Sequence, residues 1–300
     1  MTRAEGLPPP RLPVLVYHGG CDSSPVVAMS EETSIERAGF VERAIIRHRA
    51  HQSIDAIDHV AEEIPVALVF NGISHVVMMA TPRDLEAFAY GFALTEGVVA
   101  SAGAIFDCEV VLRPDSAEVA LSIAQEDFVR LKDRRRQLTG RTGCGVCGID
   151  SIDMLDLQPE ALPPPLIHVD LPAALARASS GLHEHQALMR ATGGVHAAAW
   201  CTPEGDIVHV FEDVGRHNGL DKLIGHLALS GTDMRRGFVF LSSRGSYELA
   251  RKAARMRIPL LATISAPSSL AISIATQAGM KLVGFCRQDA YVDYTPGITL

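Results

Sequence analysis

The C-terminal half of the chain alternates short apolar stretches with amphipathic segments of helical period, and this pattern restricts the fold more than any other feature of the sequence. Stretches typical of strands lie at 195–201, 207–212, 238–241, 260–264 and 282–285, and segments typical of helices lie at 218–229, 247–256 and 269–278. Strands that are connected by single helices form a parallel sheet with helices packed on its faces. The sequence therefore predicts an α/β domain over residues 151–300.

Polar residues follow the predicted strands of this sheet. In open α/β sheets, ligands bind beyond the carboxyl ends of the strands, where helix N-termini offer free N–H donors. The residues at these ends supply cations, hydroxyls, an imidazole, amides and a carboxylate, which together suit a phosphate-bearing ligand that contains a base. They are Arg216, His217, Asn218, Ser242, Arg244, Ser265, Cys286, Arg287, Gln288 and Asp289. We therefore predict a nucleotide-like site at this rim, and guanine nucleotides are the probe that tests it.

Several rim residues also have a plain structural interpretation. His217 lies at a strand-to-helix turn, where its imidazole could contact a ligand or make only a local hydrogen bond. Arg244 is placed to bind phosphate or carboxylate, but it could instead form a surface salt bridge. Cys286 ends a buried strand, a position more typical of core packing than of chemistry. His196 begins an apolar strand, where a buried histidine with satisfied hydrogen bonds is at least as consistent with the sequence as a functional one.

The first half of the chain predicts a smaller α+β unit over residues 35–150, preceded by a flexible leader over 1–34 that is rich in Pro, Gly and Ser. Residues 64–70 and 73–80 are typical of two strands, and Asn71-Gly72 between them favours a type I′ hairpin turn. A helix is expected to open at Thr81-Pro82 and to end near Gly97. A strand pair at 109–112 and 117–123 and a helix at 127–137 complete the unit. The Pro163-Pro164-Pro165 run then favours a domain boundary.

The unit ends in Thr142-Gly143-Cys144-Gly145-Val146-Cys147-Gly148, where two thiols lie three positions apart among glycines. A thiolate is the nucleophile in sulfur transfer and a ligand in metal binding, and small neighbours allow a partner's reactive atom to come close. Structural zinc usually needs four ligands, which Cys108, Cys201, Cys286 or a histidine would have to complete. A thioredoxin-like pair is expected at a helix start after a strand. We favour an exposed loop in which Cys144 carries a persulfide and Cys147 is a second or resolving thiol.

Composition and charge exclude several classes of protein. The net charge of −8 gives no indication of a nucleic-acid or anionic-membrane partner. Six cysteines in 300 residues are too few for a disulfide scaffold and fit a reducing cytoplasm. No stretch approaches the length of a membrane span. The basic run 132–136 is the local exception, and it is typical of a solvated helix face or of a contact for an acidic partner.

Several longer motifs resemble the formate dehydrogenase accessory sulfurtransferase family, FdhD. They are FNG (70–72), GFALTEG (91–97), TGCGVCG (142–148), TGGVHAA (192–198), EDVGRHNGLDKLIG (212–225), SSRGSYELARKAA (242–254), SAPSSLAI (265–272) and LVGFCR (282–287). These motifs occur in the order of the family and span about residues 55 to 300. Such a series in register is far more specific than one CxxC pair.

The resemblance implies a sulfur carrier that accepts persulfide sulfur from a cysteine desulfurase and delivers it to the bis-molybdopterin guanine dinucleotide cofactor of formate dehydrogenase. It implies Cys144 as the persulfide carrier, Cys147 as its companion, and a cofactor contact over Cys286 to Tyr291, which adds Ala290 and Tyr291 to the rim. It also implies a cytidine-deaminase-like three-layer α/β sandwich, a homodimer, and the catalytic subunit of formate dehydrogenase as a partner. Deaminase chemistry is not implied, because the HxE and PCxxC zinc signature is absent.

Two other functions compete with sulfur transfer. A zinc-stabilised nucleotide-binding regulator would hold stoichiometric metal on Cys144 and Cys147 and would have no free thiolate. A disulfide oxidoreductase would turn over a peptide disulfide without any desulfurase. We expect no resident metal, and neither alternative accounts for the polar rim and the thiol loop together.

Overall fold

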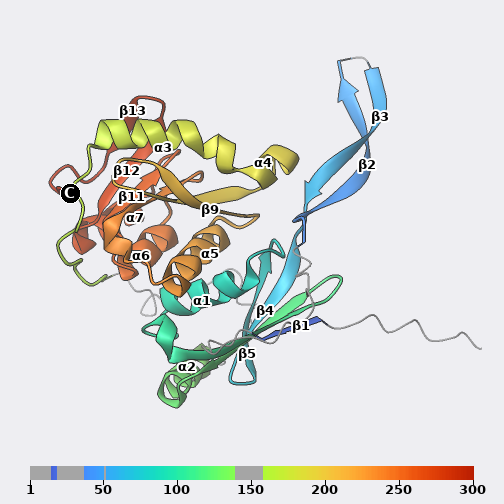
Figure 1. The fold of residues 1–300 in the computed structure, drawn as a ribbon, viewed down its shortest axis with the longest axis horizontal. Helices are drawn as coiled ribbons and strands as arrows, with labels where there is room; N and C mark the ends of the chain where they lie inside the picture. Colours follow the sequence, from blue (N-terminus) through green and yellow to red (C-terminus); the bar gives the residue numbers. More distant parts are fainter. Residues whose placement is uncertain (1–14, 19–36, 51, 139–157) are drawn as a thin grey trace, which may run out of the picture.

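The computed structural model describes residues 15–18, 37–50, 52–138 and 158–300. The strands form a five-stranded sheet in the small N-terminal domain and a six-stranded sheet in the large C-terminal domain (Figure 1). A separate antiparallel hairpin consists of β2 (Phe40–Arg49) and β3 (Gln52–Ala61). Among the helices of the described residues, none is long and apolar enough to cross a membrane.

The small domain is built on a sheet with the strand order β1-β6-β7-β4-β5. Its strands are β1 (Leu15–His18), β4 (Ile64–Phe70), β5 (Ile73–Ala80), β6 (Ile105–Leu112) and β7 (Ala117–Ile123). The predicted β4–β5 hairpin is confirmed, with positive φ at both Asn71 (45°) and Gly72 (77°) as a type I′ turn requires. β4 and β7 run parallel, and the other neighbours are antiparallel.

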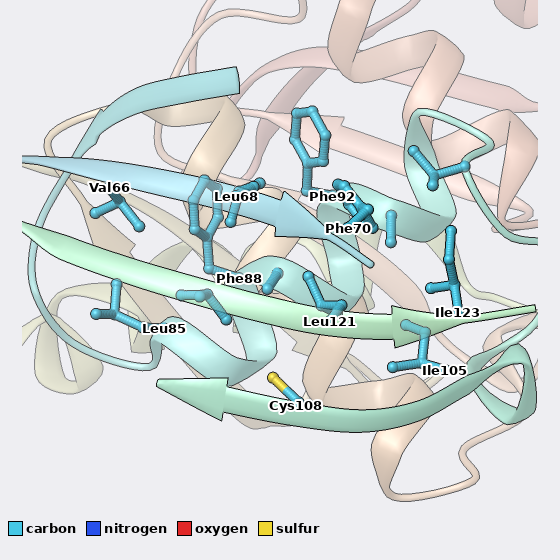
Figure 2. Close-up of a cluster of buried hydrophobic side chains, with 14 of the residues drawn as sticks. Val66, Leu68, Phe70, Leu85, Phe88, Phe92, Ile105, Cys108, Leu121 and Ile123 are labelled. Atoms are coloured by element: carbon cyan, nitrogen blue, oxygen red, sulfur yellow. The ribbon is translucent and has the colours of Figure 1, made fainter. Parts of the chain in front are cut away.

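The helices α1 (Leu85–Thr95) and α2 (Gln125–Leu138) belong to this domain, with a short 3₁₀ turn, η1 (Ala102–Ala104), after α1. The apolar stripe of α1 packs on the sheet, and Phe88 and Phe92 belong to the same buried cluster as Leu68 and Leu121 of the strands (Figure 2). The expected helix start at Thr81-Pro82 is wrong, because α1 begins at Leu85 after Asp84 in left-handed conformation (φ 53°). Thr81 does not cap α1, since its polar groups bond to the large domain.

Part of the expected flexible leader is a strand. Residues 15–18 pair antiparallel with residues 109–112 of β6. Leu15, Val16 and Tyr17 form a short apolar run that contains a β-branched and an aromatic side chain, which favours a strand. The prediction for 1–14 and 19–34 falls outside the described residues.

The large domain has a mixed sheet with the strand order β13-β12-β11-β10-β8-β9. Its strands are β8 (His196–Cys201), β9 (Ile207–Asp213), β10 (Phe238–Leu241), β11 (Leu260–Thr263), β12 (Lys281–Arg287) and β13 (Ala290–Asp293). Only β10, β11 and β12 run parallel to one another, as predicted for strands joined by helices. The prediction of a wholly parallel sheet is wrong, because tight turns rather than helices connect β8 to β9 and β12 to β13.

Helices cover both faces of this sheet. The helices α5 (Arg216–Leu229), α6 (Tyr247–Arg255) and α7 (Ser269–Ala278) pack on one face against residues such as Val239 and Leu261. The helix α3 (Leu171–His185) packs on the opposite face against Phe240 and Ala262. The short helix α4 (Ala187–Thr192) follows α3, and η3 (Met234–Arg236) precedes β10. The domain therefore has helix, sheet and helix layers.

The two domains meet where α1 crosses α5. A Cβ placed at Gly91 would lie 1.8 Å from the backbone oxygen of Asp221, and one at Gly225 would lie 1.8 Å from that of Ala87. Both positions therefore exclude any side chain, and the helices touch backbone to backbone.

Buried ions reinforce this junction. Lys252 Nζ lies 2.9 and 2.8 Å from the two carboxylate oxygens of Asp221 and 2.8 Å from Thr95 Oγ1. Glu96, which ends α1, pairs with Arg251 at 2.7 Å and with Lys252 at 2.8 Å. These two cations hold the pKa of Glu96 near 2, against the opposing effect of burial. Asp221 of α5 is thus held in a buried ion pair with Lys252 of α6.

Candidate functional site

The polar strand ends gather at one edge of the large sheet, as the sequence predicts. β9 is antiparallel to β8, and β8 is antiparallel to β10, so β9 ends on the same side as β10, β11 and β12. Four strand spacings separate β9 from β12 across this edge, which corresponds to about 19 Å. A rim of this length suits an extended ligand better than a small one.

Asp213 organises the turn at the end of β9. Its Oδ1 accepts from Gly215 N–H at 2.7 Å and from Asn218 Nδ2 at 2.9 Å. Its Oδ2 accepts from Thr81 N–H at 3.0 Å and pairs with Lys222 Nζ at 2.7 Å, and neither charged side chain is exposed. Lys222 also donates to the Thr81 carbonyl at 3.0 Å. The carboxylate thus joins the turn before α5 to the end of β5 in the small domain.

Arg216 and His217 open α5 from this turn. The Nε atom of Arg216 is buried, and no described residue accepts a hydrogen bond from it. His217 Nε2 lies 3.3 Å from Ser246 Oγ and 3.6 Å from a Glu248 carboxylate oxygen. Burial, then the charge of Arg216, lowers the pKa of His217 to about 4, against the attraction of Glu248. His217 is therefore a neutral imidazole at pH 7.

His196 and Asn218 lie beside this turn. His196 pairs with Asp213 in the β8–β9 register and is half-buried. Burial and the charge of Arg216 lower its pKa. Asn218, which the sequence suggests as a ligand contact, is buried, and its amide donates to the Met79 carbonyl at 2.8 Å and to Asp213. Its side chain therefore supports the domain junction.

The middle of the rim is formed by the loops after β10 and β11. Ser242 Oγ accepts from Ala197 N–H at 2.8 Å, and the Arg244 side chain is exposed. The carbonyl of Ser265 accepts from Thr263 Oγ1 at 2.7 Å. The two loops are tied together by Ser268 N–H, which donates to the Gly245 carbonyl at 2.8 Å.

The predicted segment 286–291 forms the far end of the rim, at the turn between β12 and β13. Arg287, Gln288, Asp289 and Ala290 are exposed, whereas Tyr291 packs against the core on the α3 face. Cys286 is buried in that core and its carbonyl accepts from Ser179 Oγ at 3.2 Å. The Cys286 side chain therefore packs in the core, whereas the exposed residues Arg287 to Ala290 are accessible to a ligand.

Sequence reasoning missed Ser246 and Glu248, which contact His217 from the start of α6. Glu248 lies in the first turn of α6, and its pKa is lowered, although burial opposes this. The sequence contained a signal for both residues, because Ser246 and Glu248 lie at the start of the helix predicted from residue 247, directly after the rim residues Ser242 and Arg244.

Cys144 and Cys147 lie outside the described residues. The described cysteines Cys108, Cys201 and Cys286 are all buried and free of disulfides. Burial raises the pKa of Cys108 to about 12 and of Cys286 to about 11, and it raises that of Cys201 as well. Among the residues that the structure describes, no three His, Cys, Asp or Glu side chains are grouped as a metal site.

Comparisons with known proteins agree with this architecture. A solved structure from Desulfotalea psychrophila, of a "putative formate dehydrogenase accessory protein", superposes with a TM-score of 0.64 at 23% identity and covers 87% of this chain and 99% of its own. It shares the fold. The class of protein is therefore a two-domain α/β protein with the fold of that structure.

Sequence comparison then identifies the family. A protein from Burkholderia mallei named "Sulfur carrier protein FdhD" is 59% identical over 89% of this chain and 99% of its own length. Proteins of the same name from Chromobacterium violaceum and Acinetobacter baylyi are 61% and 46% identical, over 86% and 89% of this chain and 96% and 97% of their own lengths. The family model described as FdhD/NarQ matches residues 61–298. The chain belongs to the FdhD/NarQ family.

Proposed function

We propose that this protein is a cytoplasmic sulfur carrier that serves formate dehydrogenase. The observation that carries the proposal is the identity of 59% to a sulfur carrier protein over 99% of that protein's length. The aligned region covers 89% of this chain, and the family model matches residues 61–298, which contain the rim. A cysteine desulfurase would supply the sulfur, and the catalytic subunit of formate dehydrogenase would receive the finished cofactor. A homodimer and the likeness of the large domain to cytidine deaminases belong to the same proposal.

The rim is proposed to hold the sulfur acceptor, the bis-molybdopterin guanine dinucleotide cofactor, as a bound substrate. Its polyanionic phosphates fit the cations at this edge, because the buried Nε of Arg216 lacks an acceptor among the described residues and the Arg244 and Arg287 side chains are exposed. Neutral His217 can present a hydrogen bond there without adding a second buried charge. The length of the rim suits a ligand with two nucleotide arms.

The chemistry is proposed to occur on the pair Cys144 and Cys147. The Cys144 thiolate attacks the terminal sulfur of the desulfurase persulfide, a new S–S bond forms, and the desulfurase thiolate leaves. If the Cys147 thiolate then attacks the inner sulfur of the Cys144 persulfide, the S–S bond to the terminal sulfur breaks and a Cys144–Cys147 disulfide forms. The terminal sulfur leaves as sulfide, reduced by the two electrons that the two cysteine sulfurs lose in forming the disulfide. That sulfide is the form that molybdenum ligates.

Sulfur loading is tested by mass spectrometry after incubation with a cysteine desulfurase and cysteine. We expect one or more added sulfur atoms on the peptide that contains Cys144, and none on that peptide in Cys144→Ala. Cys108→Ala is the matched control, because Cys108 is buried and should never be loaded. Stoichiometric zinc with no sulfur gain would support the regulator instead.

Cofactor binding is tested with guanosine diphosphate in calorimetric titrations. Arg216→Gln removes the charge that would pair with phosphate, and we expect affinity to fall by about tenfold or more, as for a charged hydrogen bond. Arg177→Gln removes an exposed arginine from a pair with Asp206 on the surface and should leave affinity unchanged. Equal affinities for the two variants would refute a role for Arg216.

A further inference from the structure

His217 has one ring nitrogen that is bonded within the protein and one that is not. Its Nε2 lies 3.3 Å from Ser246 Oγ and 3.6 Å from a Glu248 carboxylate oxygen. No group of the described residues bonds to Nδ1, and the side chain, at the start of α5, is 30% exposed. His217 therefore offers Nδ1 to the rim. Whether this nitrogen donates or accepts depends on which nitrogen of the neutral ring carries the proton.

The groups around Nε2 place the proton on that nitrogen. Burial raises the pKa of Glu248, but hydrogen bonds from its own backbone N–H and from the Ser246 hydroxyl lower it overall, so the carboxylate is ionised at neutral pH. Because the single hydroxyl hydrogen of Ser246 goes to this carboxylate, Ser246 Oγ is left to accept. Both oxygens near Nε2 are therefore acceptors, and a lone pair on Nε2 would face them without a hydrogen in between. Nε2 carries the proton, and Nδ1 carries the lone pair.

The ligand group that meets Nδ1 must then be a hydrogen-bond donor. A phosphate offers only acceptor oxygens and a negative charge, and the carboxylate of Glu248, whose side chain is 49% exposed, would repel it. Arg216, which directly precedes His217, is the residue proposed to bind phosphate, because its buried Nε has no acceptor among the described residues. In a nucleotide, the group next to the phosphates is the ribose. Its hydroxyls are donors of the kind that Nδ1 requires.

We propose that Nδ1 of His217 accepts a hydrogen bond from a ribose hydroxyl of the nucleotide arm, and that Ser246 and Glu248 are positioning residues that fix the tautomer. Acceptor side chains recognise ribose in the same way in other nucleotide sites, where a carboxylate accepts from the hydroxyl. The inference rests on the proposed binding of a nucleotide-bearing cofactor at the rim, and it names the part of the ligand that His217 recognises. The rim should therefore distinguish ribonucleotides from deoxyribonucleotides.

Calorimetric titrations with guanosine diphosphate and with its 2′-deoxy and 3′-deoxy forms test the proposal. We expect the wild type to bind one of the deoxy forms about three- to tenfold more weakly, as for the loss of one neutral hydrogen bond. His217→Gln places its amide near the position of Nε2 and should lose this preference, whereas His217→Asn places its amide oxygen near Nδ1 and should regain part of it. Glu204→Gln is the control, because Glu204 is exposed in the β8–β9 turn, at the opposite edge of the sheet.

The outcomes separate this inference from the proposed function. Equal affinity of the wild type for all three ligands, or an unchanged preference in His217→Gln, would overturn the ribose contact while leaving nucleotide binding at the rim intact. Inosine diphosphate lacks only the 2-amino group of the base. A change in the preference for guanosine over inosine diphosphate in His217→Gln would move the contact to the base and overturn the ribose assignment. A wild type that does not bind guanosine diphosphate would refute the proposed site and this inference together.

Two-bond proton–nitrogen correlation NMR tests the tautomer without any ligand. At neutral pH, the His217 signals, assigned by their loss in His217→Gln, should show a protonated Nε2 and an unprotonated Nδ1. Glu248→Gln should shift the ring toward the other tautomer, because the new amide can donate to Nε2, and Glu204→Gln should not. Circular dichroism checks that the variants fold. A proton on Nδ1 in the wild type, or an unchanged tautomer in Glu248→Gln, would overturn the proposed arrangement.

Discussion

The buried pair of Lys222 and Asp213 should be among the most sensitive positions of the chain. Both charged side chains are fully buried, at 2.7 Å, and Lys222 also donates to the Thr81 carbonyl. Lys222→Met keeps the length of the side chain but leaves the Asp213 carboxylate without its cation. Breaking a buried ion pair by removing one partner costs about 3 to 5 kcal/mol.

The structure indicates the lower end of this range. Three donors remain on Asp213 after the substitution, from Thr81, Gly215 and Asn218, and hydrogen bonds to a charged group partly offset the loss. We therefore expect a loss of about 3 kcal/mol in the free energy of unfolding. With a urea m-value of about 3 kcal/mol/M, the midpoint falls by about 1 M.

Equilibrium urea unfolding, followed by circular dichroism and by the fluorescence of the single tryptophan, Trp200 in β8, measures this shift. Arg177→Met is the control, because it breaks the pair with Asp206, whose side chains are 58% and 59% exposed. It should cost less than about 1 kcal/mol. If Lys222→Met and Arg177→Met lowered the midpoint equally, the buried pair would contribute no more to the stability of the domain junction than an exposed pair does.

Three further predictions concern other parts of the molecule. Gly225→Ala should lower the melting temperature strongly in calorimetry, because the added methyl would lie 1.8 Å from the Ala87 backbone oxygen. Gly231→Ala is the control, because there is open space around Gly231 and the substitution should cost little beyond the strain of its positive φ. Equal melting temperatures for the two variants would contradict the close helix crossing. His217 should titrate near pH 4 by NMR rather than near the ordinary value of 6.5. Between these two pH values the imidazole takes up a proton only in the unfolded chain, so the free energy of unfolding should fall as the pH falls. His217→Gln should reduce this pH dependence. Cys108, Cys201 and Cys286 should not react with iodoacetamide at neutral pH until the protein is denatured, because burial raises the pKa of each thiol. Peptide mapping measures the labelling, and label on any of the three in the native protein would refute this expectation.

Elements with a one-sided apolar pattern and clear end signals could be predicted from the sequence. The strands β4 and β5 agree with the predicted residues because Asn71-Gly72 fixes their turn. The helix α7 agrees at both ends, where Ser268 caps it and Gly279 adopts the left-handed conformation that ends it. In both cases local chemistry alone determines the boundaries.

Elements that depend on distant partners could not be predicted in the same way. The hairpin β2–β3 carries isoleucines and charges on both faces, so its sequence lacks the alternation that marks a half-buried strand. The start of α1 was misplaced because Thr81 bonds to Asp213 and Val214, more than 130 residues away, rather than capping the helix. The rim could be predicted because β10, β11 and β12, which single helices join, run parallel and end at one edge of the sheet. The junction of the rim with the small domain could not be predicted, because it depends on contacts between residues far apart in the sequence.

The contact between α1 and α5 has a consequence for how the chain loses its structure. Gly91 and Gly225 let the backbones of α1 and α5 touch, so separating the two helices would expose buried charged side chains such as Lys252 to water. We therefore expect the small domain to have no independent melting transition, and heating should produce one cooperative endotherm. Either half expressed alone would present this helix surface and its ions to water, and would be expected to aggregate rather than fold.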